Sequence, residues 1–142
     1  MILYLDTSAL VKRYFQETFS EDVSSKWAQS AAVVTSAVAY AETLATIFRK
    51  KNESGLQDRV VETIVSLFKR DWISFIQVEV KNDLNDYVDR VVQKHLLRGF
   101  DAIHLASALV IHEKFPHDFF FACFDQRLNQ AARIEGLETF SC

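Results

Sequence analysis

The stretch ILYLDTSAL, residues 2–10, decides how the rest of the chain is interpreted. Four apolar residues run into Asp6, the hydroxyls of Thr7 and Ser8 follow, and the chain then becomes apolar again. A short apolar run of this kind is typical of a buried strand. In parallel sheets, ligands bind beyond the carboxyl ends of the strands. The stretch therefore predicts a buried first strand with Asp6 at a ligand-binding edge.

The composition favours one globular domain, which we expect to cover residues 1–142, with 49% hydrophobic and 25% charged residues. The formal net charge of −3 excludes a generally basic nucleic-acid binder, so any such binding needs local basic patches. No apolar run reaches the roughly 18 residues of a membrane span, and the apolar start is interrupted at Asp6, unlike a signal peptide. Cys123 and Cys142 indicate neither a disulfide framework nor a zinc site, which favours the cytoplasm.

Short apolar runs alternate with longer helical segments along the chain. We expect strands at residues 2–5, 32–35, 72–78 and 119–124, with an edge strand at 138–140. The expected helices are 8–15, 20–30 with Ser20 as N-cap, 37–51, 56–70, 82–94, 101–114 and 126–134. The 119–124 run is almost unbroken in its apolar character, as in a central strand buried on both faces. This alternation predicts an α/β sandwich around a mostly parallel sheet flanked by helices.

Four carboxylates stand alone among apolar neighbours in the sequence: Asp6, Glu42, Asp101 and Asp125. The three Asp residues stand where helices begin, so the simpler interpretation of any one of them is an N-cap. Glu42 lies inside an expected helix with no Lys or Arg at helical spacing, and a divalent cation would offset the cost of its desolvation. If the first strand and the 119–124 strand are neighbours, their carboxylates converge on one crevice. Oxygen ligands of this kind suit Mg²⁺ or Mn²⁺.

Segments that each carry one of these acids, taken in order, resemble the PIN domain, and within it the VapC-type toxins of prokaryotic toxin–antitoxin pairs. They read DTSALVKRY, AYAETLATIFRK, RGFDAIHLASAL and FFFACFDQRLNQAAR. The resemblance runs from Met1 to about Leu137. It implies a PIN-like three-layer sandwich, metal-dependent endonucleolytic cleavage of RNA, a cognate DNA-binding antitoxin held in an apolar groove, and a homodimer.

The resemblance also implies a role for each acid. Asp6 and Asp101 would be the principal ligands of Mg²⁺ or Mn²⁺. Glu42 would bind metal or hold the attacking water, and Asp125 would support a second metal or orient water. All four would be the catalytic residues of a hydrolase acting on phosphodiester bonds.

Neighbouring side chains are expected to support these acids. Ser8 matches the family's hydroxyl behind the first acid, and we expect it and Thr7 to hold the Asp6 carboxylate in place. Cys123 stands where many members carry Thr or Ser. Because a thiol is a poor hydrogen-bond partner, the polar support of Asp125 is expected to be weaker here.

RNA binding needs local positive charge, and basic side chains near the expected ligands are candidates for it. The candidates are Lys12, Arg13, Arg49, Lys50 and Arg127. His104 follows Asp101 by three residues on the same helical face, so it either touches the site or RNA, or is a packing residue with satisfied nitrogens.

Other functions are left open by the sequence. A PIN nuclease of RNA maturation outside toxin–antitoxin systems is one, and a PIN domain that binds RNA or a protein partner without cleaving is another. A receiver-like phosphoacceptor fits poorly, because it needs an Asp ending a mid-chain strand and a Lys after a late one. A haloacid-dehalogenase-type phosphatase needs an Asp where Ser8 stands.

Overall fold

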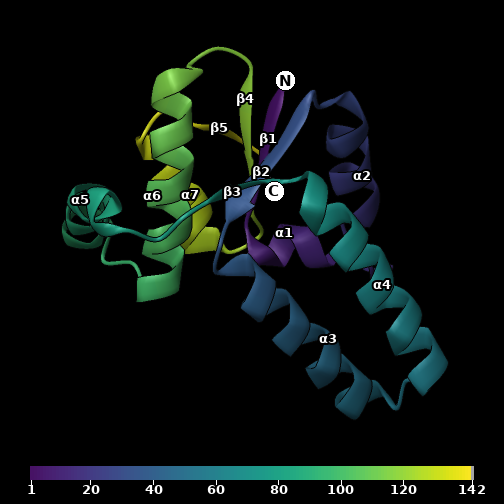
Figure 1. Cartoon of the computed structure of the whole chain (residues 1–142). Coiled ribbons are helices and arrows are strands. Elements are labelled where there is room, and N and C mark those ends of the chain that lie inside the picture. The colour runs from purple at the N-terminus through teal and green to yellow at the C-terminus, as the bar shows by residue number, and fades with distance from the viewer. Residues whose placement is uncertain (142) are drawn as a thin grey trace.

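The structure, a computed structural model, describes residues 1–141 (Figure 1). Cys142 and its expected lack of a disulfide lie outside these residues, and Cys123 is a buried free thiol. The strands are β1 (Ile2–Leu5), β2 (Ala32–Ser36), β3 (Ile76–Val78), β4 (Phe119–Ala122) and β5 (Glu138–Thr139). The helices are α1 (Thr7–Val11), α2 (Ser20–Gln29), α3 (Ala39–Ser54), α4 (Asp58–Ser74), α5 (Asn85–His95), α6 (Gly99–Lys114) and α7 (Gln126–Ile134), with a short 3₁₀ turn at Asn82–Leu84.

The strands form one sheet in the order β3-β2-β1-β4-β5, and every pairing in it is parallel. β1 lies at the centre, with Ile2 opposite Ala32 of β2 on one side and Phe119 of β4 on the other. Parallel neighbours need long crossovers, which the helices provide. The expected α/β sandwich with a largely parallel sheet is confirmed, as is the edge position of β5.

Helices cover both faces of the sheet and make three layers (Figure 1). Successive strand residues point to opposite faces. Leu3 and Leu5 of β1 therefore pack in the cluster that includes residues of α1, α2, α3 and α4. Tyr4 packs in the other cluster, against α5, α6 and α7. Burial on both faces explains why β1 and β4 read as unbroken apolar runs.

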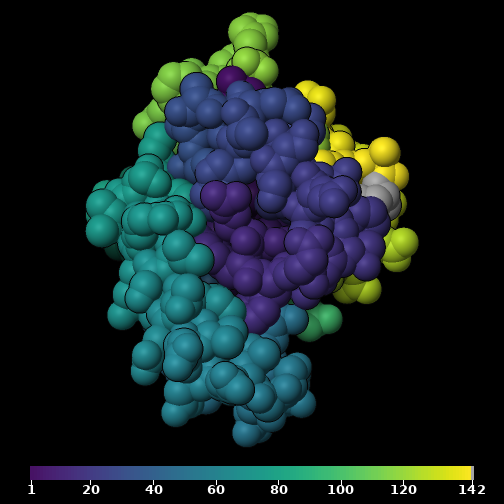
Figure 2. Space-filling model, turned by 90° about the vertical axis from the view of Figure 1, so that its right-hand side faces the viewer, coloured from purple at the N-terminus to yellow at the C-terminus, as the bar shows by residue number. Residues whose placement is uncertain are grey.

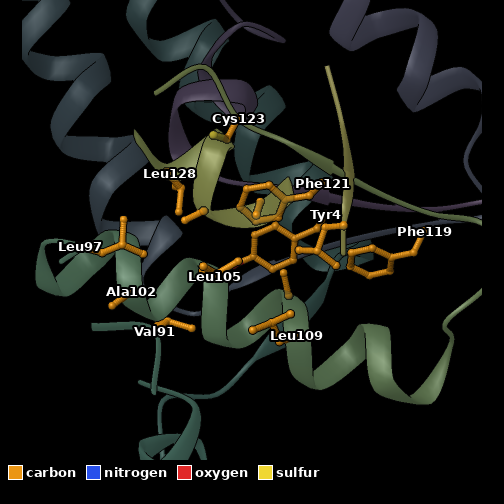
Figure 3. Packing of buried hydrophobic residues seen from close by; sticks show 14 of the residues in the cluster. Tyr4, Val91, Leu97, Ala102, Leu105, Leu109, Phe119, Phe121, Cys123 and Leu128 are labelled. Atoms are coloured by element: carbon orange, nitrogen blue, oxygen red, sulfur yellow. The ribbon is translucent and has the colours of Figure 1, made fainter. Parts of the chain in front are cut away.

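Tyr4 is the centre of the second cluster, as Figure 3 shows. Its ring stacks on Phe121 at a centroid distance of 5.3 Å, and Leu105 of α6 lies in the same cluster. A fully buried tyrosine hydroxyl needs a hydrogen-bond partner. The Tyr4 hydroxyl lies 2.9 Å from Nδ1 of His104, so the core of this face reaches directly into the group of polar side chains described below.

α3 and α4 pack against each other as a helical hairpin that extends beyond the sheet (Figure 1). Gly55 ends α3 with a φ of 62°, and its N–H bonds to the carbonyl of Lys51. This left-handed backbone is one that glycine adopts without steric cost, which is why the turn forms here. No helix within residues 1–141 combines the length and the apolar character needed to cross a membrane.

Several expected boundaries differ from those observed, and three of them change how the sequence is interpreted. The strand expected at 72–78 is only Ile76–Val78, because α4 continues through Ser74 and Trp72 packs one turn after Phe68. The first helix is Thr7–Val11 rather than 8–15. Ser20 is not the N-cap of α2. It is the first helical residue, and its hydroxyl donates to the carbonyl of Phe15 instead.

Phe121→Ala is expected to lower the free energy of unfolding by about 3–5 kcal/mol, because it leaves a cavity beside Tyr4 in the fully buried strand β4. Urea unfolding followed by circular dichroism measures the change. Phe115→Ala is the control, since Phe115 is exposed at the end of α6 and its removal should cost less than about 0.5 kcal/mol. Equal losses in the two variants would contradict the packing described here.

Candidate active site

The carboxyl ends of β1 and β4 lie side by side, which confirms the condition for Asp6 and Asp125 to converge. Leu5 pairs with Ala122 at the end of the ladder, and the N–H of Asp6 continues it to the carbonyl of Ala122 at 3.2 Å. One residue before Asp125, the Phe124 N–H donates to Oγ of Ser8 at 3.1 Å. The two strand ends are thus joined by backbone and side-chain hydrogen bonds at the edge where ligands are expected.

Asp6 is buried, with 4% of its surface exposed. Its Oδ1 accepts hydrogen bonds from Oγ of Ser8 at 2.7 Å and from the N–H of Ala9 at 2.9 Å, so Asp6 is also the N-cap of α1. Burial raises the pKa of Asp6 to about 6; the charge of His104 and the two donors act against this, and nearby Asp101 adds to it. Keeping the Asp6 carboxylate ionised in this buried position therefore lowers the stability of the folded protein. Ser8 supports it as expected, whereas Thr7 does not bond to it.

Glu42 lies in the first turn of α3, not in mid-helix as expected, so the helix dipole favours its charge. Its Oε1 accepts from Oγ1 of Thr7 at 2.6 Å and lies 2.8 Å from Nε2 of His104. Burial acts to raise the pKa of Glu42, but the bonds from His104 and Thr7 hold it below its usual range. The sequence showed no partner at helical spacing, and the partner is instead a histidine from another helix.

His104 is a buried bridge between the core and Glu42. Nδ1 bonds with the Tyr4 hydroxyl at 2.9 Å, and Nε2 faces Glu42 at 2.8 Å. With both ring nitrogens engaged, the imidazole is fixed in orientation, and it fixes Glu42 in turn. The sequence left open whether His104 touches the site or only packs in the core. Its geometry is that of a residue that positions Glu42.

Asp101 is the third residue of α6, where Arg98 and not Asp101 is the N-cap, so the helix-cap interpretation was wrong for this acid. Burial raises the pKa of Asp101, and the charge of Asp125 raises it further. No described side chain or backbone N–H donates to its carboxylate. Asp101 therefore faces the other acids without a hydrogen-bonded counter-group from residues 1–141.

Asp125 is exposed and caps α7, accepting at Oδ1 from the N–H of Leu128 at 2.9 Å. The Cys123 thiol is buried and lies 3.4 Å from the backbone carbonyl of Asp125, not from its carboxylate. Burial raises the pKa of Cys123 well above its ordinary value, so the thiol stays protonated. Support for the carboxylate comes from the helix cap and not from position 123.

Two cavities meet at Asp125. The larger, of about 800 Å³, is lined by Arg98, Asp101, Asp125, Arg127 and Arg133 among others, and we call it the arginine groove. The smaller, of about 520 Å³, is lined by Ser8, Lys12, Arg49, Lys50, Phe124 and Asp125 among others, and we call it the lysine groove. Both grooves are open to solvent and carry cations beside the acids.

The candidate RNA contacts divide between these grooves. Lys12, Arg49 and Lys50 line the lysine groove, and Arg127 lines the arginine groove. Arg13 does not line either groove and packs its guanidinium on Trp27 instead. Arg98 was not among the candidates from the sequence, although its position three residues before Asp101 was a usable signal.

Asp6→Asn is expected to stabilise the metal-free protein at neutral pH. The pKa of about 6 in the folded state lies above the unfolded value of about 3.9, so the folded state holds the proton more tightly. The free energy of unfolding of the parent should then fall by about 2–3 kcal/mol as the pH rises from about 4 to above 6. Asn at position 6 can still accept the N-cap hydrogen bond but carries no buried charge, so the variant should not lose stability as the pH rises.

Urea unfolding in chelator, at about pH 4 and about pH 7.5, measures the effect. Asp125→Asn is the matched control, because it replaces an exposed N-cap and relieves no burial. A parent and an Asp6→Asn variant with the same pH dependence would show that Asp6 is not strained by burial.

Comparison with known proteins identifies the family to which this fold belongs. The PIN domain model matches residues 3–134. "Ribonuclease VapC45" of Mycobacterium tuberculosis is 31% identical over 139 residues, which are 95% of this chain and 92% of that protein. The structures of FitAcB from Neisseria gonorrhoeae (TM-score 0.69, 16% identity, 99% and 97% of the two chains) and of VapBC2 from Rickettsia felis bound to promoter DNA (0.66, 12%, 99% and 98%) share the fold. The chain therefore belongs to the PIN-domain family and is a homologue of the VapC ribonucleases.

Proposed function

We propose that the chain is a single PIN domain over residues 1–142 that acts as a Mg²⁺- or Mn²⁺-dependent endoribonuclease, the toxin of a type II toxin–antitoxin pair. Its homologue VapC45 is described as a ribonuclease. The proposal rests on the site as well as on this relationship. It assigns the catalytic work to Asp6, Glu42, Asp101 and Asp125.

The observation that carries the proposal is how these carboxylates divide their oxygens. The protein's hydrogen bonds reach only Oδ1 of Asp6, Oε1 of Glu42 and Oδ1 of Asp125. The second oxygen of each, and both oxygens of Asp101, receive no donor from residues 1–141. Asp6, Glu42 and Asp125 are therefore each held by one oxygen and keep the other for a ligand, and Asp101 keeps both. A carboxylate that served only as a helix N-cap would not need three further carboxylates close to it.

The donor set fits a hard divalent cation. All four groups offer oxygen, and Mg²⁺ commonly takes one or two carboxylates with waters filling its other positions. No three His, Cys, Asp or Glu side chains among residues 1–141 stand together as a preformed metal cluster, so waters or substrate would supply the remaining ligands. Burial and the charge of Asp125 raise the pKa of Asp101, a sign of negative charge in excess. Asp6 and Asp101 would be the main ligands of an ion that offsets charge on the phosphate and favours deprotonation of the attacking water.

The remaining steps fall to the protein's own groups. Against the effect of burial, His104 and Thr7 hold the pKa of Glu42 low, so this carboxylate is ionised at neutral pH and its Oε2 can accept a hydrogen bond that orients the attacking water. Because His104 is itself fixed by Tyr4, the acceptor is held in one orientation. Cations of the two grooves bind the phosphates on either side of the cut.

The proposed partners follow from the relatives. One structure that shares the fold is a toxin–antitoxin complex from Klebsiella pneumoniae, and VapBC2 is bound to a DNA fragment from its promoter. We infer a cognate DNA-binding antitoxin, a homodimer and a cytoplasmic location for this chain. Figure 2 shows the N-terminal segment recessed between α2 and the α3–α4 hairpin, a hollow of the kind in which a partner helix lies.

Asp101→Asn is expected to reduce RNA cleavage by at least about hundredfold, because it removes a charge that binds the cation while α6 stays intact. Discrete cuts in a cellular RNA pool, with Mg²⁺ or Mn²⁺ and then with chelator, measure this. Chelator should abolish the cuts made by the parent chain.

Asp118→Asn serves as the control. Asp118 is an exposed acid at the opposite end of β4, with a φ of 62° that Asn accommodates well, so activity should be unchanged. Cuts that survive both chelator and Asp101→Asn would reject the proposed site. A folded parent chain that cuts no RNA with either metal would favour a PIN domain that only binds.

A further inference from the structure

Three phenylalanine rings form a column beside the acids. Phe19 stacks on Phe124 with centroids 5.2 Å apart and planes 12° apart, and Phe124 stacks on Phe140 at 5.3 Å and 22°. Phe140 meets Phe120 of β4 edge-on at 4.8 Å, which anchors the inner end of the column in the core. The outer end, Phe19, is 40% exposed. The column thus presents an aromatic face to solvent.

The backbone holds Phe19 in an unfavourable conformation. Its φ is 71°, in the left-handed region that bulky residues avoid, and as the N-cap of α2 it makes no capping side-chain bond. Asn or Gly would suit this position better. The hydroxyl of Ser20 secures the turn through bonds with Phe15 and Glu17. A strained residue secured in this way commonly serves a function, and what Phe19 adds here is its ring.

The column is joined to the acids by hydrogen bonds. Phe124 directly precedes Asp125, and its N–H donates to Ser8, whose hydroxyl donates to Asp6. A base stacked on Phe19 would therefore lie one ring away from Phe124, the residue that directly precedes Asp125.

Cations lie along the same surface. Phe124 lines the lysine groove with Lys12, Arg49 and Lys50, and Nζ of Lys12 lies 4.9 Å from the Phe124 ring centroid. Glu17 bonds to Lys12 at 3.3 Å and to Lys50 at 3.2 Å, which orders both along the groove. Proteins that bind single-stranded nucleic acid combine these features, since cations follow the phosphates and aromatic faces stack with the bases.

We propose that the Phe19–Phe124–Phe140 column is a base-stacking platform for an unpaired nucleotide of the RNA substrate, next to the phosphate that is cut. This inference rests on the proposed function. The base adds to the exposed face of Phe19, and the adjoining phosphates lie on Lys12, Arg49 and Lys50. Because every base has an aromatic face, the platform selects unpaired nucleotides without reading their identity. An apolar side chain of a protein partner would use Phe19 but not the cations.

Binding is tested separately from cleavage, in the Asp101→Asn background with chelator. The probe is a single-stranded RNA octamer of adenosines with one central 2-aminopurine, whose fluorescence falls when it stacks. Phe19→Gly removes the ring and suits the left-handed backbone, so the fold is kept. It is expected to weaken binding about tenfold and to abolish the quenching. Phe19→Tyr should retain both.

Phe115→Ala is the matched control, an exposed phenylalanine at the far end of α6 from Asp101, and it should bind the octamer like the parent. Thermal melting of each variant verifies folding. Unchanged affinity and quenching in Phe19→Gly would overturn the platform, as would an equal loss in Phe115→Ala or a parent protein that binds the octamer without quenching. Cleavage by the wild-type chain, measured separately, shows whether the proposed function stands in any of these cases.

Discussion

The pairing of β1 with β4 is the constraint on which the rest of the site depends. These strands are far apart in the sequence, yet Leu5 of β1 pairs with Ala122 of β4, 117 residues later. Only this register brings Asp6 and Asp125 to the same edge, and Phe124 within reach of Ser8. The two strands pair because both are apolar on both faces and each needs cover from a sheet neighbour and from helices above and below.

The acids at this edge are held against their own repulsion and desolvation. Burial raises the pKa of both Asp6 and Asp101; the charge of Asp101 raises the pKa of Asp6 further, and the charges of Asp125 and Glu42 raise the pKa of Asp101. The protein relieves only part of this cost, through Ser8 and Ala9 at Asp6 and through His104 at Glu42. An arrangement that sacrifices stability in this way is typical of functional sites, where local rules of folding are violated and compensated elsewhere.

Asp125 joins this strained centre to the surface. It lines both the lysine groove and the arginine groove, so a strand of RNA that follows the cations from one groove to the other must cross the acids. Of the two grooves, only the lysine groove is lined by a ring of the aromatic column, that of Phe124. The two sides of the cut would therefore be bound differently, by stacking and charge on one side and by arginine side chains on the other. Such asymmetry would fix the direction in which the proposed substrate strand lies across the site.

The sequence by itself determined the fold class and singled out the four acids of the proposed site. Apolar runs of strand length alternating with helical periods predicted the parallel sandwich, because burial on both faces leaves a visible pattern. Asp6 and Asp125 were found because each follows such a run. The boundary between α4 and β3 was missed, since an apolar stretch such as 72–78 suits a helix end as well as a strand.

Only the tertiary structure decided how the acids are held and what surrounds them. The partner of Glu42 is His104, 62 residues away, and Thr7 bonds to Glu42 rather than to Asp6. The column joins Phe19, near the N-terminus, to Phe124 and Phe140, near the C-terminus. Such contacts leave no period or spacing in the sequence, because they arise from how separate elements meet in space.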